Sequence, residues 1–408
     1  MKSLDSKEHS LWFTSAMGLA QICSWGTLFY GFPLIALNTG SSRRTTKYAP
    51  NPTLYGAATI GMLLGGLAAY PVGTAIDQGL GRYLMSGASV VAALLYVIWS
   101  QVDTVVPFYL VLAVLGLMQA ATLYDPAFAV IARRFGPARA RSGITTLTLW
   151  GGFASTVFIP LIQFTIDIYG WRSALLLMAA VNFFICGGLY FLVINPKRDE
   201  TVHLLQSGAT ASNTGRGAVR AAMRLPSYWG LMVAWISYAI AISTLTYHFF
   251  PLLIERGLSS AGAVAVLSVI GPAQVAGRVV VVAFAGRAPI RIVGSFTVIV
   301  FPLAILCFAF APPEVLMLSA VAAVYGAANG IATIVRGTSV PEMISNTHYG
   351  AINGSLVGPM NMTTALVPLG AAFLWEATGS YDAVLAAMFL GSLCLCAGFW
   401  FAAIKARR

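Results

Sequence analysis

The sequence predicts an all-α membrane protein of twelve transmembrane helices, arranged as two pseudo-symmetric bundles of six. Three observations lead to this fold class. Apolar residues make up 58% of the 408 residues and charged residues only 9%, against roughly 25% charged in soluble domains. Twelve apolar runs of membrane-spanning length follow one another along the chain. The first six runs share features, in the same order, with the last six. The composition excludes one large soluble core, so we expect many membrane spans.

The twelve runs give the predicted helices in order. They are Leu11–Leu37, Thr53–Val72, Tyr83–Ser100, Val105–Ala132, Ile144–Ile166, Ser173–Ile194, Trp229–Ile254, Ala261–Ala285, Ile292–Ala311, Val315–Val335, Ala351–Trp375 and Val384–Ile404. Each run is about 18–28 residues long, and a helix of that length crosses ~30 Å of hydrocarbon. We expect no cleavable signal peptide, because the first run is too long and lacks a small-residue cleavage site.

The distribution of basic residues predicts the orientation in the membrane. With both termini in the cytoplasm, the outer segments carry few of the 24 Lys and Arg residues, namely Arg43, Arg44, Lys47, Arg172 and Arg256. Nearly all the others fall in inner segments, as the positive-inside rule requires. We therefore expect an integral, multi-pass protein of the plasma membrane, which is the inner membrane if the chain is bacterial. The net charge of +11 fits this distribution, and no basic-aromatic surface typical of nucleic-acid binding is present.

The longest polar segment divides the chain into two halves. Residues 195–225 are rich in Ser, Thr, Gly and Arg, have little to bury, and favour a solvated cytoplasmic linker. The alternative for their last part, Gly217–Leu225, is a short helix on the membrane surface. The predicted domains are thus an N-terminal six-helix bundle (1–194), the linker (195–225) and a C-terminal six-helix bundle (226–408).

The two halves carry matching features, which indicate a duplication. The matches are Phe29-Tyr30-Gly31-Phe32-Pro33-Leu34 with Tyr247-His248-Phe249-Phe250-Pro251-Leu252, Gly116-x-x-Gln119 with Gly326-x-x-Asn329-Gly330, and Gly81-Arg82 with Gly286-Arg287. The paired glycines Gly61 and Gly65, and Gly326 and Gly330, predict close helix contacts. An even number of helices per half gives both copies the same orientation. Transporters built in this way bind their substrate where the repeats meet and rock one half against the other.

Three charged residues lie inside apolar runs: Asp125, Arg278 and Arg336. A charge there costs ~3 kcal/mol or more on insertion scales and marks a function or a tightly paired structural site. A guanidinium binds a carboxylate through a planar two-point fork, so Arg278, Arg336 or both predict an organic-anion site. Gln274 lies one helical turn before Arg278, on the same face. The alternative is that Arg336 pairs with Asp125 and closes a cytoplasmic gate.

Asp125 is the candidate for proton coupling. It precedes Pro126, which frees a carbonyl and is expected to kink the helix. A carboxyl in a low-dielectric site is able to carry a proton near neutral pH. The alternative is a permanently ionised acid paired with an arginine.

Other polar and aromatic residues are candidates to line the substrate cavity. His248 titrates in a useful range, and the alternative for it is a hydrogen-bonded core histidine. The remaining candidates share a polar group within an apolar run, and for each the alternative is a contact that holds helices together. They are Gln21, Trp25, Tyr30, Asn329 and Asn361.

This layout resembles the major facilitator superfamily over nearly the whole chain. The loop after run two, Gly73-x-x-x-Asp77-x-x-x-Gly81-Arg82, is similar to the family signature G-x-x-x-D-(R/K)-x-G-(R/K), with Gln78 in place of a base and Gly81 one place late. The resemblance implies that this loop latches the cytoplasmic side, with Asp77 near a helix N-terminus and Arg82 paired with an acid. The segment Gly170-Trp171-Arg172 before run six is also common in the family.

Within the superfamily, two segments resemble the monocarboxylate porters. Those porters carry Asp-x-x-x-Arg on helix eight, and the resemblance implies that the arginine holds the substrate carboxylate. This chain has Gln274-x-x-x-Arg278 there, and Ser24-Trp25-Gly26 resembles part of their motif in run one. The acidic residues of both motifs are absent, so the porters' mode of proton coupling does not carry over. Gly116 stands where multidrug antiporters often have an arginine, which disfavours drug antiport.

Together these features predict a secondary active transporter that moves a small, monocarboxylate-like organic anion with protons by alternating access. The alternative is proton-driven efflux of a metabolite or drug-like compound. We do not expect an enzyme, because the four histidines and five cysteines form no nucleophile, acid–base or metal cluster, and we interpret the cysteines as packing residues. The expected partners are the substrate, protons and the lipid bilayer. We expect a monomer that uses no cofactor, metal or nucleic acid.

Overall fold

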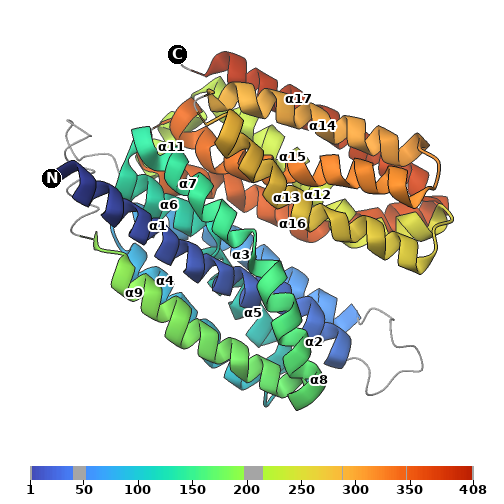
Figure 1. Ribbon diagram of the computed structural model, residues 1–408, viewed down its shortest axis with the longest axis horizontal. Coiled ribbons are helices and arrows are strands. Elements are labelled where there is room, and N and C mark those ends of the chain that lie inside the picture. Colours follow the sequence, from blue (N-terminus) through green and yellow to red (C-terminus); the bar gives the residue numbers. More distant parts are fainter. Residues whose placement is uncertain (1, 40–51, 197–214, 287, 346, 407–408) are drawn as a thin grey trace. The chain divides into compact units, whose positions relative to one another are not determined.

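The computed structural model describes residues 2–39, 52–196, 215–286, 288–345 and 347–406, and every regular element within them is a helix (Figure 1). Within these ranges, ten helical segments are long and apolar enough to cross a membrane. One of them, Arg139–Val193, has 55 residues and a non-helical backbone at Gly170, so it provides two crossings. With the helical segment 2–39, the helices account for the predicted twelve spans. The predicted all-α membrane fold is confirmed.

The chain forms two compact units. Unit 1 comprises Met1–Ser212 with His348–Gly354, and unit 2 comprises Asn213–Thr347 with Ser355–Arg408. The predicted division into residues 1–194, 195–225 and 226–408 stays a prediction, and residues 197–214 of the linker lie outside the described ranges.

The end of the predicted linker is helical, as α11 (Gly215–Met223). Val219 and Ala222 are buried, and the indole N–H of Trp229 donates to the carbonyl of Met223 at 2.8 Å. This part of the linker is therefore a short helix with one buried face, and its place in the cytoplasm or at the membrane surface stays a prediction. Apolar residues three positions apart give this short stretch a face to bury once it becomes helical.

Unit 1 consists of helices with two π-helical segments, η1 and η2. The elements are α1 (Lys2–Trp25), η1 (Gly26–Tyr30), α2 (Gly31–Thr39), α3 (Pro52–Asp77), α4 (Gly81–Trp99), α5 (Val105–Thr122), α6 (Tyr124–Phe135), α7 (Pro137–Gly151), α8 (Ala154–Ala180), η2 (Val181–Gly187) and α9 (Gly188–Val193). π-Helical turns of this kind occur often at functional sites. Here η1 and η2 interrupt the first and sixth spans.

Unit 2 contains α11 and six long helices (Figure 1). These are α12 (Pro226–Glu255), α13 (Ser260–Phe284), α14 (Ile290–Phe310), α15 (Val315–Met343), α16 (Tyr349–Thr378) and α17 (Tyr381–Lys405). The first turns of α16, up to Gly354, group with unit 1.

A close helix crossing is built twice, once in each unit. In unit 1, a Cβ atom on Gly116 of α5 would collide with the backbone of Gly61 of α3. In unit 2, a Cβ atom on Gly330 of α15 would collide with the backbone of Gln274 of α13, and one on Gly277 with the backbone of Ala327. The predicted close-contact role of the glycines in runs two and ten is confirmed. At each contact at least one of the two residues is a glycine, and its missing side chain allows the helix backbones to approach this closely.

A second recurring feature is a hydrogen bond from a neighbouring helix to the backbone carbonyl that a proline leaves without a donor. A proline has no N–H for the carbonyl four residues earlier, and a bare carbonyl is costly in a membrane. In three places within the described residues, a side chain from another helix supplies the missing donor. These are Gln21 to Thr122 O (2.7 Å) below Pro126, Ser243 to Thr364 O (2.7 Å) below Pro368, and Cys396 to Val298 O (3.2 Å) below Pro302.

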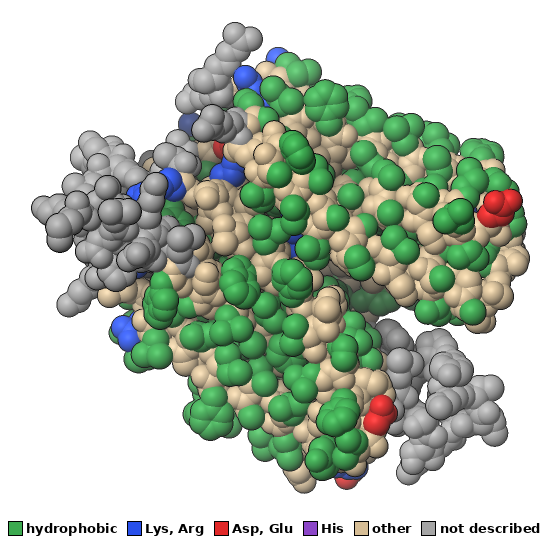
Figure 2. Space-filling model, in the orientation of Figure 1, with side chains coloured by type: hydrophobic (Ala, Val, Ile, Leu, Met, Phe, Trp, Pro, Cys, Tyr) green, Lys and Arg blue, Asp and Glu red, His purple; other side chains and the backbone are tan. Residues whose placement is uncertain are grey.

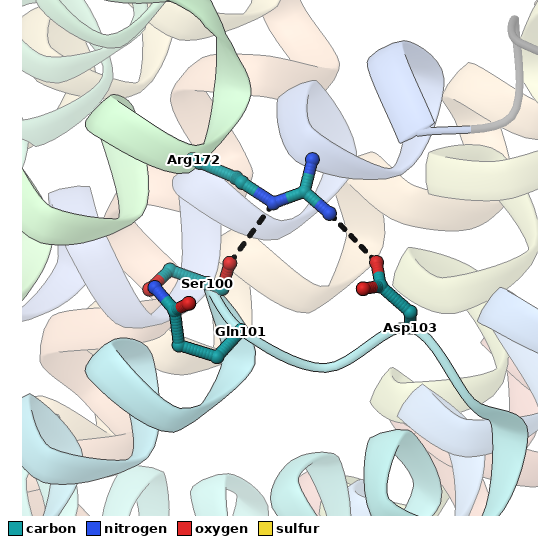
Figure 3. Close-up of polar contacts among 4 residues, drawn as sticks. All are labelled: Ser100, Gln101, Asp103 and Arg172. Atoms are coloured by element: carbon teal, nitrogen blue, oxygen red, sulfur yellow. Dashed lines mark hydrogen bonds and ion pairs between the residues drawn. The ribbon is translucent and has the colours of Figure 1, made fainter.

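At the predicted outer end of unit 1, Arg172 binds the loop between α4 and α5 (Figure 3). Its Nε donates to the carbonyl of Ser100 at 3.0 Å, and its Nη2 lies 2.6 Å from a carboxylate oxygen of Asp103. Gly170 makes the preceding turn with φ 81° and ψ 165°, a conformation essentially restricted to glycine. After this turn, Arg172 reaches the α4–α5 loop. Because both charged groups are at least half exposed, the ion pair stabilises the fold by no more than ~1 kcal/mol.

The outer surfaces of the helices are apolar (Figure 2). Phe284, Phe310 and Leu316 are each more than 80% exposed, as lipid-facing side chains are expected to be. Cys307 and Cys394 belong to this exposed surface, so the interpretation of all five cysteines as packing residues is wrong for these two. The other three are buried.

Candidate functional site

Unit 2 buries two arginines close to one tyrosine. Arg278 of α13 is 4% exposed and Arg336 of α15 is 8% exposed. Both guanidinium groups lie within electrostatic range of the phenol of Tyr238 in α12. Gly277, the residue before Arg278, lies at the close α13–α15 crossing, which brings the two arginine-bearing helices together. Three helices therefore converge on one cationic region.

A polar stripe on α15 extends this region. Asn329, Thr333 and Arg336 are spaced i, i+4 and i+7, so they share one face of the helix. The Tyr238 hydroxyl donates to Oδ1 of Asn329, and Thr333 Oγ1 donates to the carbonyl of Asn329 at 3.1 Å. Asn329 was predicted from the sequence, whereas Tyr238 and Thr333 were not. The helical spacing from Arg336 would have found Thr333.

The other unit 2 candidates have different surroundings. Gln274 is half-buried one turn before Arg278, and its backbone touches Gly330. Asn361 is half-buried on α16.

His248 makes two hydrogen bonds, Nδ1 with the Tyr381 hydroxyl at 3.0 Å and Nε2 with the Pro368 carbonyl at 2.9 Å. A carbonyl only accepts, so Nε2 carries a proton and donates it to the Pro368 carbonyl, and Nδ1 shares a hydrogen bond with the Tyr381 hydroxyl. Both ring nitrogens are occupied, as in the core-histidine alternative. Its role in substrate binding stays a prediction.

In unit 1, aromatic rings gather beside the start of α6. The ring of Trp25 lies 4.7 Å from that of Tyr124 and 6.5 Å from that of Tyr30, measured between centroids. The indole nitrogen of Trp25 is buried and has no hydrogen-bond partner among the described residues. Tyr124 directly precedes Asp125, so the structure places two predicted site residues, Trp25 and Tyr30, next to the turn that carries the candidate coupling acid.

The two candidate acids of unit 1 bind the same short stretch of α16. The carboxylate of Asp77 accepts the backbone N–H groups of Gly350 at 2.9 Å and Ala351 at 2.7 Å. Nδ2 of Asn353, which is 3% exposed, donates to Oδ1 of Asp125 at 3.2 Å. Asp77 thus lies at a helix N-terminus, as the resemblance implies, where the helix dipole favours a negative charge. The contribution of this turn was not predicted from the sequence.

The basic residues near Asp77 differ from those expected. Arg133 donates to the backbone carbonyl of Asp77, and His348 lies within electrostatic range of its carboxylate. Arg82 instead lies over the ring of Phe191, 3.9 Å from the centroid. Among the described residues, it forms no ion pair of the kind that the resemblance implied. No group of three or more His, Cys, Asp or Glu side chains in the described ranges is placed to hold a metal ion.

Comparison with known proteins identifies the family. The family model of the Major Facilitator Superfamily matches residues 14–313. Monocarboxylate transporter 11 of Homo sapiens is 28% identical over 217 residues, which are 52% of this chain and 44% of that protein. Monocarboxylate transporter 13 of Rattus norvegicus is 32% identical over 123 residues, which are 29% of this chain and 28% of that protein. The chain thus aligns with less than half the length of these curated relatives.

Solved structures show the same fold. The E. coli fucose:proton symporter FucP has a TM-score of 0.68 and 15% identity, with 98% of each chain covered. The human organic anion transporter MFSD10 has a TM-score of 0.69 and 14% identity, with 97% of this chain and 99% of that chain covered. At these identities the likeness shows the fold alone. Because the family model covers most of the chain and the fold agrees with it, this protein belongs to the Major Facilitator Superfamily, a family of transporters rather than enzymes.

Proposed function

We propose that this transporter moves a small, monocarboxylate-like organic anion together with protons, as a secondary active carrier working by alternating access. The observation that carries the proposal is the burial of Arg278 and Arg336 around Tyr238 in unit 2. The printed names of the curated relatives, which are monocarboxylate transporters, support the same substrate class.

The chemistry of this region suits a carboxylate. A guanidinium presents two parallel N–H donors to the two oxygens of a carboxylate, and such charge-assisted bonds are about twice as strong as neutral ones. The hydroxyl of Tyr238 and the amide of Asn329 add polar groups at the same place. An alcohol offers no planar pair of acceptors, and an ammonium group is repelled. We therefore propose Arg278 and Arg336 as the anion-binding groups, with Tyr238 and Asn329 orienting the substrate.

The remaining roles follow from the positions of the side chains. In unit 1, Trp25 and Tyr30 are proposed substrate-binding residues, which supply an apolar surface and a buried indole N–H. Asp77 and Arg82 serve the cytoplasmic gate. In unit 2, Gln274, Asn361 and His248 are proposed to line the substrate path. On this proposal the carrier is a monomer of the plasma membrane with both termini in the cytoplasm.

Asp125 is the proposed proton carrier. It is half-buried, begins the inner part of the fourth span and bonds to the buried amide of Asn353. Taking up a proton removes the charge from this carboxylate and weakens the bond to Asn353, because a charge-assisted bond becomes a neutral one. Gain and loss of one proton at Asp125 would then alter how the first turns of α16 are held.

Asp125→Asn separates proton coupling from anion binding. We expect liposomes containing this variant to exchange a labelled monocarboxylate against the unlabelled one, because the arginines are intact. Accumulation driven by a pH gradient should be lost, because an amide carries no titratable proton. Uptake of a panel of radiolabelled monocarboxylates, from acetate to benzoate, is measured with and without the gradient.

The matched control is Asp167→Asn, which removes an exposed acid of the same unit. It should change neither exchange nor accumulation. If Asp125→Asn accumulated substrate as well as the wild type, Asp125 would not be the coupling residue.

A further inference from the structure

The helix of the fourth span is interrupted in its middle, and specific side chains bind the backbone carbonyls at the interruption. Helix α5 ends at Thr122, Leu123 has an extended backbone with φ −75° and ψ −156°, and α6 begins at Tyr124. In a continuous helix the residue at position 126 would donate its N–H to the carbonyl of Thr122. Pro126 has no N–H to give. A bare carbonyl at this depth would be costly, because no water is available to replace the donor.

Gln21 of α1 supplies the missing donor. Its amide nitrogen lies 2.7 Å from the carbonyl oxygen of Thr122, 3.4 Å from that of Leu123 and 2.9 Å from the hydroxyl of Tyr190. An amide has two N–H bonds, so one serves the broken helix and the other serves Tyr190. The Tyr190 hydroxyl also donates to Thr122 O at 3.3 Å and lies 3.0 Å from Ser24 Oγ.

These donors are fully enclosed. Gln21, Ser24 and Tyr190 are each 0% exposed, so no lipid or bulk water takes part in the arrangement. The sequence analysis treated Gln21 as a candidate cavity residue, and the structure instead places it as a contact between helices. The groups that bind the carbonyls of Thr122 and Leu123 determine how α6 starts. They therefore determine the direction in which the first turn of α6 presents its side chains.

We propose that Gln21 is a positioning residue for proton coupling. By replacing the N–H that Pro126 lacks, it fixes the break in the fourth span and holds Asp125 where the proton must be taken up and released. Gln21 itself touches neither substrate nor proton. The proposal rests on the proposed function, in which Asp125 carries the proton. It also explains how the carboxylate of Asp125 keeps a defined position although a proline directly follows it.

The test uses Gln21→Met, which keeps the length of the side chain and removes both donors. In purified protein reconstituted into liposomes, we expect uptake of a radiolabelled monocarboxylate driven by a pH gradient to fall by about 10- to 100-fold, the scale expected for a reacting group displaced by about 1 Å. Counterflow exchange should keep its KM, and the number of protons moved per anion should fall. A loss of folded protein alone would leave that ratio unchanged.

Pro126→Ala provides the rescue. It puts an N–H back at position 126, and once the two helices join into one this N–H reaches the carbonyl of Thr122 in place of Gln21. Adding Gln21→Met to Pro126→Ala should therefore reduce pH-driven uptake by less than about threefold. The control is Asn182→Leu, which removes another fully buried amide of unit 1, one that bonds Thr27 and the carbonyl of Met178. Its effect should be the same with and without Pro126→Ala, and it should leave the proton-to-anion ratio unchanged.

Two results would overturn the proposal. One is a Gln21→Met effect of equal size with and without Pro126→Ala, and the other is an unchanged proton-to-anion ratio in Gln21→Met. If Pro126→Ala is not produced, the labelling rate of the thiol in Asp125→Cys serves instead. This labelling rate should change severalfold when Gln21→Met is added and stay constant when Asn182→Leu is added. A rate that is unchanged by Gln21→Met but altered by Asn182→Leu would contradict the inference. Intact coupling in Asp125→Asn would instead defeat the proposed function itself, so the two failures are distinguishable.

Discussion

Replacing either buried arginine by glutamine is expected to lower Vmax/KM for monocarboxylate transport by about 100-fold or more, since a lost pair of charge-assisted hydrogen bonds is worth ~3 kcal/mol. Arg278→Gln and Arg336→Gln keep a polar side chain of similar reach but remove the charge and the fork. Arg336→Lys should recover only part of the loss, because an ammonium group restores the charge without the planar pair of donors. Initial uptake rates in liposomes, over a range of substrate concentrations, measure the effect.

Arg172→Gln is the matched control for this prediction. Arg172 is exposed and paired with Asp103, so its loss should leave transport within about twofold of the wild type. Intact anion transport in both Arg278→Gln and Arg336→Gln would rule out the proposed site.

The gate alternative for Arg336 predicts a different pattern from the anion site. If Arg336 closes a gate with Asp125, Arg336→Gln should leave KM unchanged, and combining it with Asp125→Asn should restore activity that either change alone removes. If Arg336 holds the anion, the double variant should be as inactive as Arg336→Gln alone. The two roles are thus separated by one double-mutant cycle.

Gly277→Ala is expected to have the largest effect on stability. A Cβ atom there would meet the backbone of Ala327, which cannot turn aside as a flexible side chain can. Helices α13 and α15 would have to separate. Overpacking of this kind costs typically ~1–3 kcal/mol, and more where backbone is involved. We expect a large drop in Tm in detergent, and a loss of transport because Arg278 is the next residue along α13.

Gly271→Ala, on the same helix, is the matched control. No atom lies within 4 Å of a Cβ built on Gly271, so alanine should gain up to ~1 kcal/mol from its higher helix propensity. Scanning fluorimetry and size-exclusion profiles compare the two variants. Equal Tm changes in both would show that the α13–α15 crossing is not as close as described here.

The fold was largely predictable from the sequence, for physical reasons. A run of apolar residues long enough to cross the hydrocarbon has few options other than a helix, because every backbone polar group must be satisfied internally. The paired glycines were equally readable, since their spacing places them on one helix face. The three intramembrane charges could be identified because charges are rare in such runs.

The details of the site were less predictable, because they depend on contacts between distant residues. The hydrogen bond from Asn353 to Asp125 joins residues 228 positions apart, and the sequence around either residue gives no sign of it. Pro126 predicted a kink, whereas the helix stops at Thr122 and restarts at Tyr124. The donor for the freed carbonyl comes from Gln21, 101 positions away. Arg82 was assigned an acidic partner by resemblance, and it packs on Phe191 because an aromatic ring lies within reach of its guanidinium group.

Central to this account is the recognition of a carboxylate by the buried guanidinium groups of unit 2. The most direct test is competition, in wild-type liposomes, between a labelled monocarboxylate and either the unlabelled acid or its uncharged primary amide. The account predicts that the amide competes only at concentrations about 100-fold higher than the acid, and that Arg336→Gln removes most of this preference. Equal competition by acid and amide in the wild type would contradict it.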